Sequence, residues 1–467
     1  MKKRLLFGLM VVMAVGVVAK NVTGKVHYIG KGLPGVVVTD GRTFTETNDE
    51  GVYSLNTADD ADFVFIVTPS GYVTSYETGT PCFYKSPDAK TMDFELHKFS
   101  VSKGRYTLFA IGDTQPGNDR AYARLEEEAF PELKEYAKTY TDKAVPVAGI
   151  LLGDMVWDNL ETYGRFKDDL KQLNYPVYPV IGNHDHEEMF ADNHKSKMCY
   201  KQNFGPNYYA FNMGNDYYIV LDNIVYKGNR KYDEKITDEQ LEWVREYTRY
   251  IPSGSRVVVA MHVPAYNYAV DKKLDGADHL MDILSAYQVT ILSGHSHIHS
   301  NIQLRPNVFE HMVSSIGGAW WLWDSQYCKD GMPMGYQVFE SSAKEVRNYF
   351  KSLHHPADYQ LKIFPFGTFE GHADELCVKV WNWDKTWKVE WMEDGVKKGS
   401  MKQFTGTDPD YGLYIEREEA QGKKRTNNRP NQNPFIFFSA KPSDKTKVVK
   451  VLVTDRFGKQ YSAEYQL

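Results

Sequence analysis

The sequence predicts an α/β layer domain that lies between two smaller all-β domains. From residue 106 to about residue 350, strand-like apolar runs alternate with helical stretches, which is the signature of an α/β layer fold. Short alternating strands separated by turn residues come before and after this region. The chain has 467 residues, too many for one hydrophobic core, so we expect two or three domains.

The first residues have the pattern of a secretory signal peptide. Met1-Lys-Lys-Arg4 is followed by an apolar run over residues 5–18, and Val17-Val-Ala19 supplies small residues for cleavage. The run is short for a spanning helix, and no other stretch is apolar enough to cross a bilayer. We therefore expect residues 1–19 to be removed, leaving a periplasmic or secreted protein without a membrane span.

The net charge argues against a nucleic-acid partner, whereas the cysteines leave the disulfide pairing open. The formal net charge is -6, whereas nucleic-acid binding needs a basic face, so we expect no nucleic-acid partner. The cysteines are scattered, and export permits disulfides, but no spacing selects one of the three full pairings. Ordinary buried thiols fit the pattern equally well. The cysteines are Cys82, Cys199, Cys328 and Cys377.

Residues 21–98 should form an N-terminal β-sandwich, because short alternating runs are separated by turns rich in Gly, Pro and Asn. The expected strands cover residues 22–28, 36–39, 52–55 and 63–67. Residues 99–104 have the composition of a linker. A carbohydrate-binding role is an alternative for this domain, but a spacer or packing role is favoured.

The central domain is expected over residues 104–352. Apolar runs predict strands, and a Thr237-x-x-Gln240 capping box begins a helix with an apolar face. The expected strands cover residues 107–111, 149–152, 177–181, 217–221, 257–261 and 289–292. The expected helices cover residues 121–139, interrupted by Pro131, and residues 160–173, 237–247 and 280–287.

After residue 352 the helical pattern stops, so residues 360–467 should form a C-terminal β-rich domain. Its expected strands cover residues 376–381, 387–391, 435–439 and 447–454. The polar composition of residues 416–434 indicates a mobile surface loop.

Five polar clusters carry the chemistry, and each directly follows a predicted strand. They are Asp113-Thr-Gln115, Gly153-Asp154, Gly182-Asn-His-Asp185, His262 and Gly294-His-Ser-His297. The carboxyl ends of strands are where reactive groups collect in α/β sheets. Carboxylate and amide oxygens mixed with imidazoles suit Mn, Fe or Zn, and not Ca or a thiolate-bound metal.

In this order the clusters resemble the calcineurin-like metallophosphoesterase superfamily, whose pattern is D-x-H, G-D, G-N-H-[DE], a lone H and G-H-x-H. The resemblance covers residues 106–350, and the flanking domains look like the modules of exported bacterial relatives. It implies a four-layer α/β sandwich, in which two mixed sheets are flanked by helices, between the all-β domains. It also implies two divalent metal ions (Mn, Zn or Fe) and a bridging hydroxide that attacks phosphorus.

The resemblance assigns roles residue by residue. Asp154 would bridge the metals, and His184 would protonate the leaving oxygen, oriented by Asp158 or Asp185. The remaining ligands would be Asp113, Gln115 and His297 for the first metal, and Asn183, His262 and His295 for the second. Gln115 departs from the pattern, because the family has His there. An amide oxygen is a weaker ligand, so the first metal should be held more loosely.

Other residues near the motifs have alternative interpretations. Trp157 stands where purple acid phosphatases have an iron-binding Tyr, which disfavours that subfamily. His299 is expected to face outward and not to be a further ligand. Trp320 and Trp321 are expected either to stack on a leaving group or to pack in the core.

The sequence therefore predicts a metallophosphoesterase that acts on a phosphorylated small molecule or glycan. A pyrophosphohydrolase acting on nucleotide-like diphosphates is the alternative within enzymes. A glycan-binding or adhesion protein with a vestigial metal site is the alternative from another class. The motifs do not select a substrate, a metal or an oligomeric state.

Overall fold

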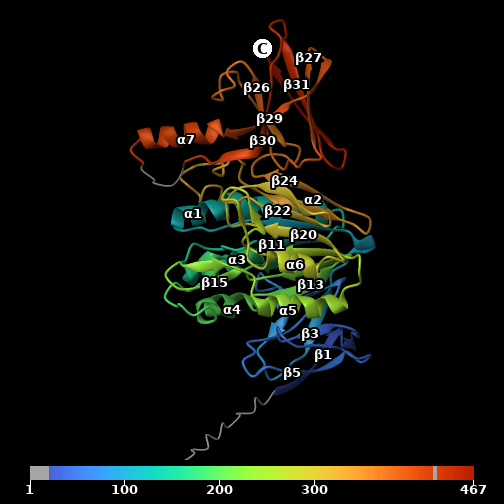
Figure 1. Cartoon of the computed structure of the whole chain (residues 1–467). Helices are drawn as coiled ribbons and strands as arrows, with labels where there is room; N and C mark the ends of the chain where they lie inside the picture. The colour runs from blue at the N-terminus through green and yellow to red at the C-terminus, as the bar shows by residue number, and fades with distance from the viewer. Residues whose placement is uncertain (1–19, 424–428) are drawn as a thin grey trace, which may run out of the picture.

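The computed structural model describes residues 20–423 and 429–467, so the expected signal peptide lies outside the described residues. The N-terminal strands, the central α/β layers and the C-terminal strands follow one another along the molecule (Figure 1). The predicted fold class, two mixed sheets flanked by helices with all-β regions at both ends, is confirmed. No helix of the described residues is long and apolar enough to cross a membrane.

One central sheet has the strand order β12-β11-β10-β23-β24. Its strands are β10 (Tyr106–Ile111), β11 (Val147–Leu151), β12 (Val177–Pro179), β23 (Gly335–Ser341) and β24 (Val346–Ser352). The first three are parallel, and β23 and β24 join them antiparallel. Phe109 and Ile111 pack against the helical layer, whereas Leu108 and Ala110 belong to the core shared with the other sheet.

The other central sheet has the order β13-β14-β17-β20-β22-β21, with β14, β17, β20 and β22 parallel. Its strands are β13 (Tyr209–Met213), β14 (Asp216–Val220), β17 (Arg256–Ala260), β20 (Gln288–Ser293), β21 (Ser300–Arg305) and β22 (Val308–Met312). The predicted strands of both sheets are confirmed within one or two residues. The β21–β22 and β23–β24 hairpins were not predicted.

Helices cover the outer faces of both sheets. They are α1 (Asp119–Arg124), α2 (Phe130–Thr141), α3 (Tyr163–Lys171), α4 (Met198–Phe204), α5 (Asp238–Tyr247) and α6 (Ala277–Ile283). The interruption predicted at Pro131 lies before that residue, at residues 125–129. A π-helical turn over residues 125–129 joins α1 to α2, and Pro131 lies in the first turn of α2, where its missing N–H costs nothing.

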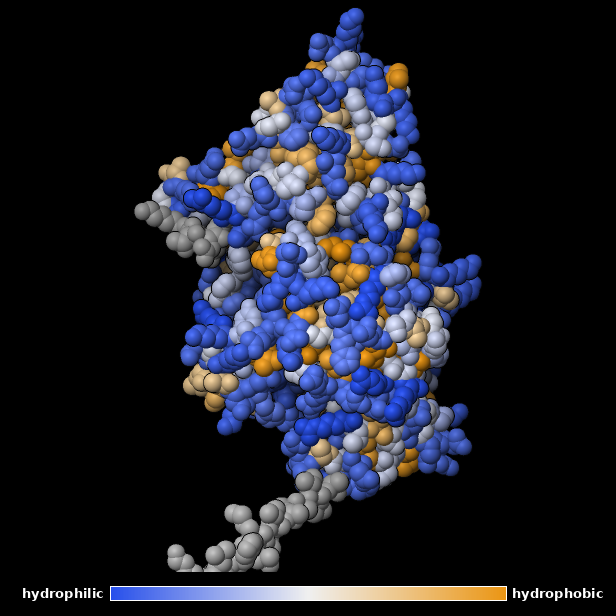
Figure 2. Space-filling model, viewed as in Figure 1, coloured by the Kyte–Doolittle hydropathy of each residue, from blue (hydrophilic) through white to orange (hydrophobic). Residues whose placement is uncertain are grey.

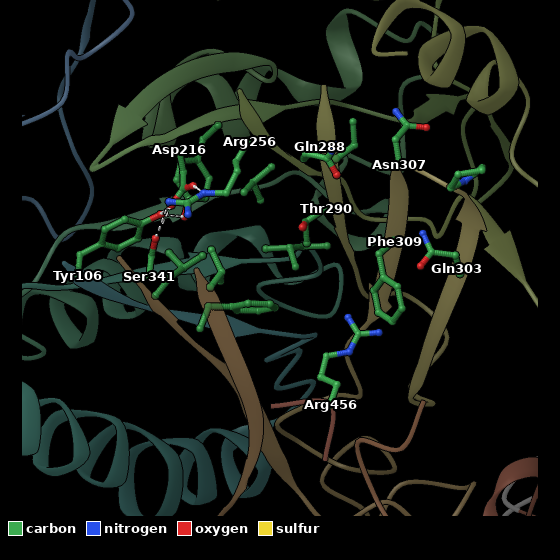
Figure 3. A pocket seen from close by; sticks show the side chains of 18 residues that line it. Tyr106, Asp216, Arg256, Gln288, Thr290, Gln303, Asn307, Phe309, Ser341 and Arg456 are labelled. Carbon is green, nitrogen blue, oxygen red and sulfur yellow. Dashed lines mark hydrogen bonds and ion pairs between the residues drawn. The ribbon is translucent and has the colours of Figure 1, made fainter. Parts of the chain in front are cut away.

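The five polar clusters follow the carboxyl ends of parallel strands in both sheets. At the opposite ends of these strands, a buried polar cluster beside a cavity of about 260 Å³ joins the two sheets (Figure 3). Asp216 accepts hydrogen bonds from Tyr106 and Ser341 and pairs with Arg256. These residues come from β14, β10, β23 and β17, so the cluster connects both sheets.

The N-terminal region forms sheets with the orders β2-β1-β9-β7, with β5 paired to β1, and β4-β3-β6-β8. Its strands are β1 (Lys20–Tyr28), β2 (Lys31–Gly32), β3 (Val37–Thr39), β4 (Phe44–Glu46), β5 (Val52–Thr57), β6 (Val64–Ile66), β7 (Tyr72–Thr74), β8 (Tyr84–Lys85) and β9 (Phe94–Lys98). Phe44 stacks on Trp243 and Tyr247 of α5, so this region shares the core of the second central sheet.

The C-terminal region forms sheets with the orders β25-β26-β30-β29 and β28-β27-β31-β32. Its strands are β25 (Leu361–Phe364), β26 (Leu376–Val380), β27 (Lys388–Glu393), β28 (Val396–Ser400), β29 (Lys402–Thr407), β30 (Gln432–Ala440), β31 (Val448–Thr454) and β32 (Gln460–Gln466). The predicted strands are confirmed here as well. The face of the molecule shown in Figure 2 is mainly hydrophilic, with apolar side chains gathered over the central layers.

The absence of a helix after residue 352 was a wrong prediction. Helix α7 (Pro409–Ala420) begins at an Asp408 cap and includes part of the expected loop over residues 416–434. Its polar sequence hides the pattern, because only Tyr411, Tyr414, Ile415 and Glu418 are buried. Residues 424–428 of the expected loop lie outside the described residues.

Candidate functional site

The polar clusters converge where the parallel strands of both sheets end. Asp113, Asp154 and Asn183 follow β10, β11 and β12. His262 follows β17, and the His295–His297 loop follows β20. Because neighbouring parallel strands end at the same edge, side chains more than 180 residues apart in the sequence, such as those of Asp113 and His297, come close together here.

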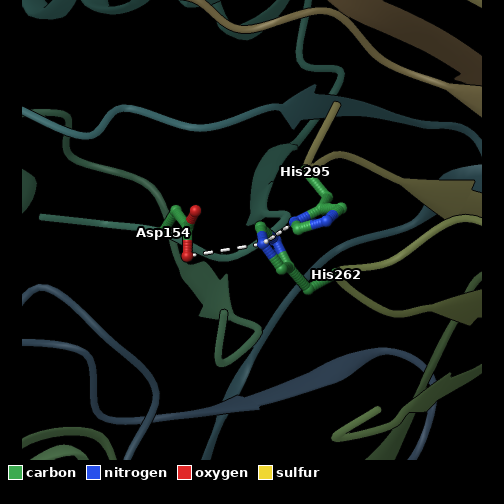
Figure 4. A group of neighbouring side chains, drawn as sticks. All are labelled: Asp154, His262 and His295. Carbon is green, nitrogen blue, oxygen red and sulfur yellow. Dashed lines mark hydrogen bonds and ion pairs between the residues drawn. The ribbon is translucent and has the colours of Figure 1, made fainter. Parts of the chain in front are cut away.

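Asp154, His262 and His295 form the tightest group, shown in Figure 4. One potential ligand atom from each lies within 4.8 Å of the others. His262 Nε2 lies 3.4 Å from Asp154 Oδ1 and 3.1 Å from His295 Nδ1. Asn183 Oδ1 also lies 3.1 Å from His262 Nε2, so the amide completes the group.

The hydrogen bonds of His262 fix which of its nitrogens faces this group. Its Nδ1 lies 2.7 Å from the Leu152 carbonyl oxygen and donates to it, so in the neutral ring Nε2 carries a lone pair. Burial lowers the pKa of His262, but Asp154 outweighs burial and raises the pKa to about 9. The carboxylate of Asp154 thus favours a positive charge at this position, which either a proton or a divalent cation would supply.

A second group lies on the other side of Asp154. His297 Nε2 is 3.5 Å from Asp113 Oδ1, and Gln115 Nε2 donates to Asp154 Oδ2 over 3.0 Å. Gln115 Oε1 is buried without a hydrogen-bond partner among the described residues. A metal ion beside Asp113 would supply the partner that this amide oxygen lacks, once the amide turns.

The donor set of both groups fits divalent metals that accept oxygen and imidazole ligands. Asp154 presents Oδ1 to His262 and Oδ2 to Gln115, so one carboxylate lies between the two groups. The side chains thus form two groups of potential ligands on either side of Asp154, called here the first position (Asp113, Gln115 and His297) and the second position (Asn183, His262 and His295).

The backbone is strained at these residues. A left-handed conformation is uncommon outside Gly and accumulates at functional sites, where the surrounding structure holds it. Positive φ angles occur at Asp113 (39°), Gln115 (37°), Asp154 (50°), Asp158 (57°), His295 (70°) and His297 (52°). Five of these residues belong to the groups described above or lie between them, and Asp158 contacts His184.

Two of the motif glycines are required by close packing. A Cβ on Gly182 would lie 2.3 Å from Asp154 Oδ1, and a Cβ on Gly294 would lie 2.6 Å from Asp113 Oδ2. Any larger residue would push a carboxylate out of the site.

His184 lies beside the second position with its ring held on several sides. Its backbone N–H donates to Asp154 Oδ1 over 2.8 Å, and its Nδ1 lies 2.8 Å from Asp158 Oδ1. The indole of Trp157 stacks on the imidazole at a centroid distance of 4.5 Å. Burial lowers the pKa of His184, but Asp154 and Asp158 raise it above the usual value.

The two carboxylates expected near His184 have different surroundings. Asp158 contacts the ring and also lies 2.9 Å from Arg230 Nη2. Asp185 is fully buried and points away, accepting hydrogen bonds from the N–H of Gly182 and Met155 and from the Tyr163 hydroxyl. Burial raises the pKa of Asp185 to about 7, with a contribution from Asp154. Asp185 thus anchors the loop, and the structure places no contact between it and the His184 ring.

The expectation that His299 faces outward was wrong. His299 is 1% exposed, its Nε2 lies 3.3 Å from Asn382 Oδ1, and burial lowers its pKa to about 4.

Trp320 and Trp321 differ from each other in burial and in their contacts. Trp321 is buried and donates to the Thr114 carbonyl oxygen, whereas Trp320 is half-buried with its ring 4.7 Å from that of His297.

Sequence reasoning missed Glu234, which braces the second position. It lies at the end of the hairpin formed by β15 (Ile224–Tyr226) and β16 (Tyr232–Glu234), and its Oε1 is 3.6 Å from His295 Nε2. His295 and then Lys272 lower the pKa of Glu234 to about 2 against the effect of burial. Nothing in the local sequence marks Glu234, because its role depends on where the hairpin folds back.

Three family models match the chain in succession. Residues 20–104 match the N terminal of calcineurin-like phosphoesterase, and residues 106–299 match calcineurin-like phosphoesterase itself. Residues 310–461 match the C terminal of calcineurin-like phosphoesterase. A search of curated proteins finds no match.

Solved structures with a similar fold include phosphatases. A dimetal phosphatase from Danio rerio is 12% identical, covers 52% of this chain and 98% of its own, and has a TM-score of 0.35. A purple acid phosphatase from yellow lupin seeds is 11% identical over 77% of this chain and 69% of its own, also with a TM-score of 0.35. A 5'-nucleotidase from Candida albicans is 10% identical over 53% of this chain and 51% of its own, with a TM-score of 0.33.

Proposed function

The chain belongs to the calcineurin-like phosphoesterase family, and on that premise we propose that it hydrolyses phosphoester bonds with two metal ions at the first and second positions. The observation that carries the proposal is Asp154, whose two carboxylate oxygens face different groups of ligand-type side chains. Both groups hold oxygen and imidazole donors, which suit Mn, Zn or Fe.

Metal ions bound there would supply positive charge to the phosphoryl oxygens and acidify water, which phosphoryl transfer requires more than covalent chemistry. Asp113, Gln115 and His297 would hold one ion and Asn183, His262 and His295 the other, with Asp154 shared. Their strained, buried loops keep these side chains in place before substrate arrives.

His184 is proposed to give a proton to the leaving oxygen. Its Nδ1–H donates to Asp158, which orients the ring and leaves Nε2 to face the substrate. Trp157 on one side of the ring and the backbone bond to Asp154 limit its rotation. Arg230 holds Asp158 in turn, and Asp185 keeps the loop in shape.

A substrate screen tests this function. Metal-free protein would be reconstituted with Mn, Zn or Fe and assayed against phosphomonoesters, phosphodiesters and nucleotide sugars. We expect release of phosphate or of an alcohol from at least one class, dependent on metal. Turnover of nucleotide sugars alone would favour the pyrophosphohydrolase. Full metal occupancy without turnover of any class would contradict the proposal and favour a binding protein.

Export is proposed from residues 1–19 of the sequence. We expect Lys20 to be the first residue of the mature protein, as N-terminal sequencing of material from the native envelope would report. Recovery of Met1 would contradict it.

A further inference from the structure

The loop over residues 315–323, called here the Trp loop, holds both segments that carry the first metal position. Ser315 Oγ donates to the Asp113 carbonyl oxygen over 2.7 Å. Trp321 Nε1 donates to the carbonyl oxygen of Thr114, between Asp113 and Gln115, over 2.6 Å. On the other segment, His297 Nδ1 donates to the Gly318 carbonyl oxygen over 3.1 Å. The Trp loop therefore sets both the orientation of His297 and the path of the Asp113 segment.

The Trp loop has a conformation that its own sequence disfavours. Trp320, Trp321 and Trp323 have φ angles of 54°, 54° and 48°. Bulky residues are rarely left-handed, and a run of them persists only where contacts from outside hold it. The source of that support lies in the C-terminal region.

Helix α7 packs against the back of the Trp loop. Ala319 and Leu322 share a buried apolar cluster with Tyr411, Tyr414 and Ile415 of α7. The Tyr414 hydroxyl donates to the Leu322 carbonyl oxygen over 2.9 Å. Figure 1 shows α7 extending from the C-terminal sheets.

The helix is itself anchored in the C-terminal region. Asp408 caps it by accepting from the Tyr411 N–H, and the same carboxylate forms a fully buried pair with Lys379 of β26 over 2.5 Å. Lys379 also donates to the Gly331 carbonyl oxygen. A rigid path thus runs from β26 through α7 and the Trp loop to the first position.

The second position has different supports. His262 rests on the Leu152 carbonyl oxygen after β11, and His295 faces Glu234 of the β15–β16 hairpin. Among the contacts of the described residues, none joins Asp154, Asn183, His262 or His295 to the Trp loop or to residues 360–467. The backbone N–H of His295 donates to Asp113, but its side chain faces His262 and Glu234.

We propose that α7 is a support for the first metal position, so that its contact with the Trp loop sets metal affinity there and leaves the second position unaffected. Tyr414 acts as a positioning residue, through the Trp loop and His297. This inference rests on the proposed metal site and adds that the C-terminal region is a working part of it.

The test compares Tyr414→Ala with a matched control on the same helix, Leu413→Ala, whose side chain is 63% exposed. Bound Mn per chain would be measured after dialysis, and affinities by titration. Removal of an outer-shell partner usually weakens metal affinity 10- to 100-fold, so we expect about a tenfold loss for the weaker class of site in Tyr414→Ala. The tighter class and the Leu413→Ala variant should be unchanged.

Two further variants, each lacking one metal position, show at which position Tyr414→Ala weakens metal binding. In Asp113→Asn, which lacks the first position, adding Tyr414→Ala should cause no further loss. In Asn183→Ala the same addition should remove the remaining metal. Tyr414→Phe keeps the packing and removes only the hydroxyl, so it provides a folded variant with a smaller loss in the same direction.

Equal weakening of both classes, or unchanged metal affinity in folded Tyr414→Ala and Tyr414→Phe, would overturn the inference. Absence of metal from the wild-type protein would overturn it together with the proposed function. Metal binding without turnover would contradict the proposed function alone, because the readout here is bound metal.

Discussion

Gln115 is the residue at which the site departs most from its family pattern. Its contacts lead us to predict how the variant Gln115→His will bind metal. Gln115 Nε2 donates to Asp154, and Gln115 Oε1 has no hydrogen-bond partner among the described residues, so this oxygen is the atom that a metal ion at the first position would use. Gln115→His would supply an imidazole, a stronger ligand for Zn or Fe, and we expect tighter metal at the first position and less dependence on added Mn. Metal retained after dialysis and activity against added Mn measure this. Identical behaviour of both forms would exclude Gln115 as a ligand.

His184 and Asp158 lead to a prediction that separates chemistry from metal binding. His184→Asn should keep bound metal and lower turnover by about two to four orders of magnitude, because a general acid is lost. Asp158→Asn should act in the same direction by less, since it only orients the ring. Both losses of turnover should be smaller for esters of acidic phenols, because a phenolate of low basicity leaves without being protonated. His194→Asn, an exposed histidine of the following segment, is the control. Loss of metal in His184→Asn would contradict its role.

Site residues that belong to a sequence motif could be predicted, whereas residues that only contact those motif residues in the folded chain were missed. Asp113, Asp154 and His262 each follow an apolar run, which is visible in the chain order. Glu234 contacts His295 only because a hairpin folds back, and periodicity contains no such information. His299 was misjudged because Asn382, its partner, comes from a distant segment.

The β15–β16 hairpin is the element on which the second position depends. Glu234→Gln removes the negative charge that faces His295 but keeps the size of the side chain. We expect metal at the second position to bind about tenfold more weakly, because outer-shell carboxylates raise ligand basicity. Mn titration of this variant beside Glu242→Gln, an exposed change on α5, measures it. Weakening of the first position instead would refute the assignment.

Strand β22 carries a buried carboxyl whose titration should affect stability. Glu310 accepts hydrogen bonds from Ala265, Tyr266 and Ser293, yet burial raises its pKa from 4.5 to about 7. A raised carboxyl pKa means that the folded state binds the proton more tightly than the unfolded state. The contribution of this proton to the free energy of unfolding is therefore fully present below pH 4.5, and it is lost as the pH rises through about 7.

The shift corresponds to about 3 kcal/mol at most, since one pKa unit is worth about 1.4 kcal/mol. In Glu310→Gln nothing titrates at this position, so its free energy of unfolding should fall less between pH 4.5 and 7 than that of the wild type. Urea unfolding of both proteins across this range measures the difference. Parallel pH profiles would show that the pKa of Glu310 is the same in the folded and unfolded states, and would contradict the shift.

Elements were predictable where apolar periodicity is strong and local. Strands β10, β11, β17 and β20 are nearly continuous apolar runs, as buried parallel strands are. Helix α7 was missed because only one narrow face is buried, against the Trp loop, and the rest of its sequence is charged. The hairpins β21–β22 and β23–β24 were missed because their strands contain polar residues that pair across the sheets.

On the scale of the whole molecule, the three regions are joined by shared cores. Phe44 of the N-terminal region stacks on α5, and α7 of the C-terminal region packs on the Trp loop. The order of the all-β and α/β regions could be predicted from composition and turn spacing. Their contacts could not, because each contact joins residues that are distant in sequence and depends on how the layers stack.

We propose that one carboxylate, Asp154, serves two metal ions on which hydrolysis depends. The most direct measurement is metal per chain and phosphoester turnover in the same samples of wild-type protein, Asp154→Ala and the exposed control Asp168→Ala. We expect turnover to follow metal occupancy in the wild type and the control, and we expect Asp154→Ala to lose both metal and turnover. An Asp154→Ala protein that is folded, keeps its metal and still turns over substrate would contradict this proposal.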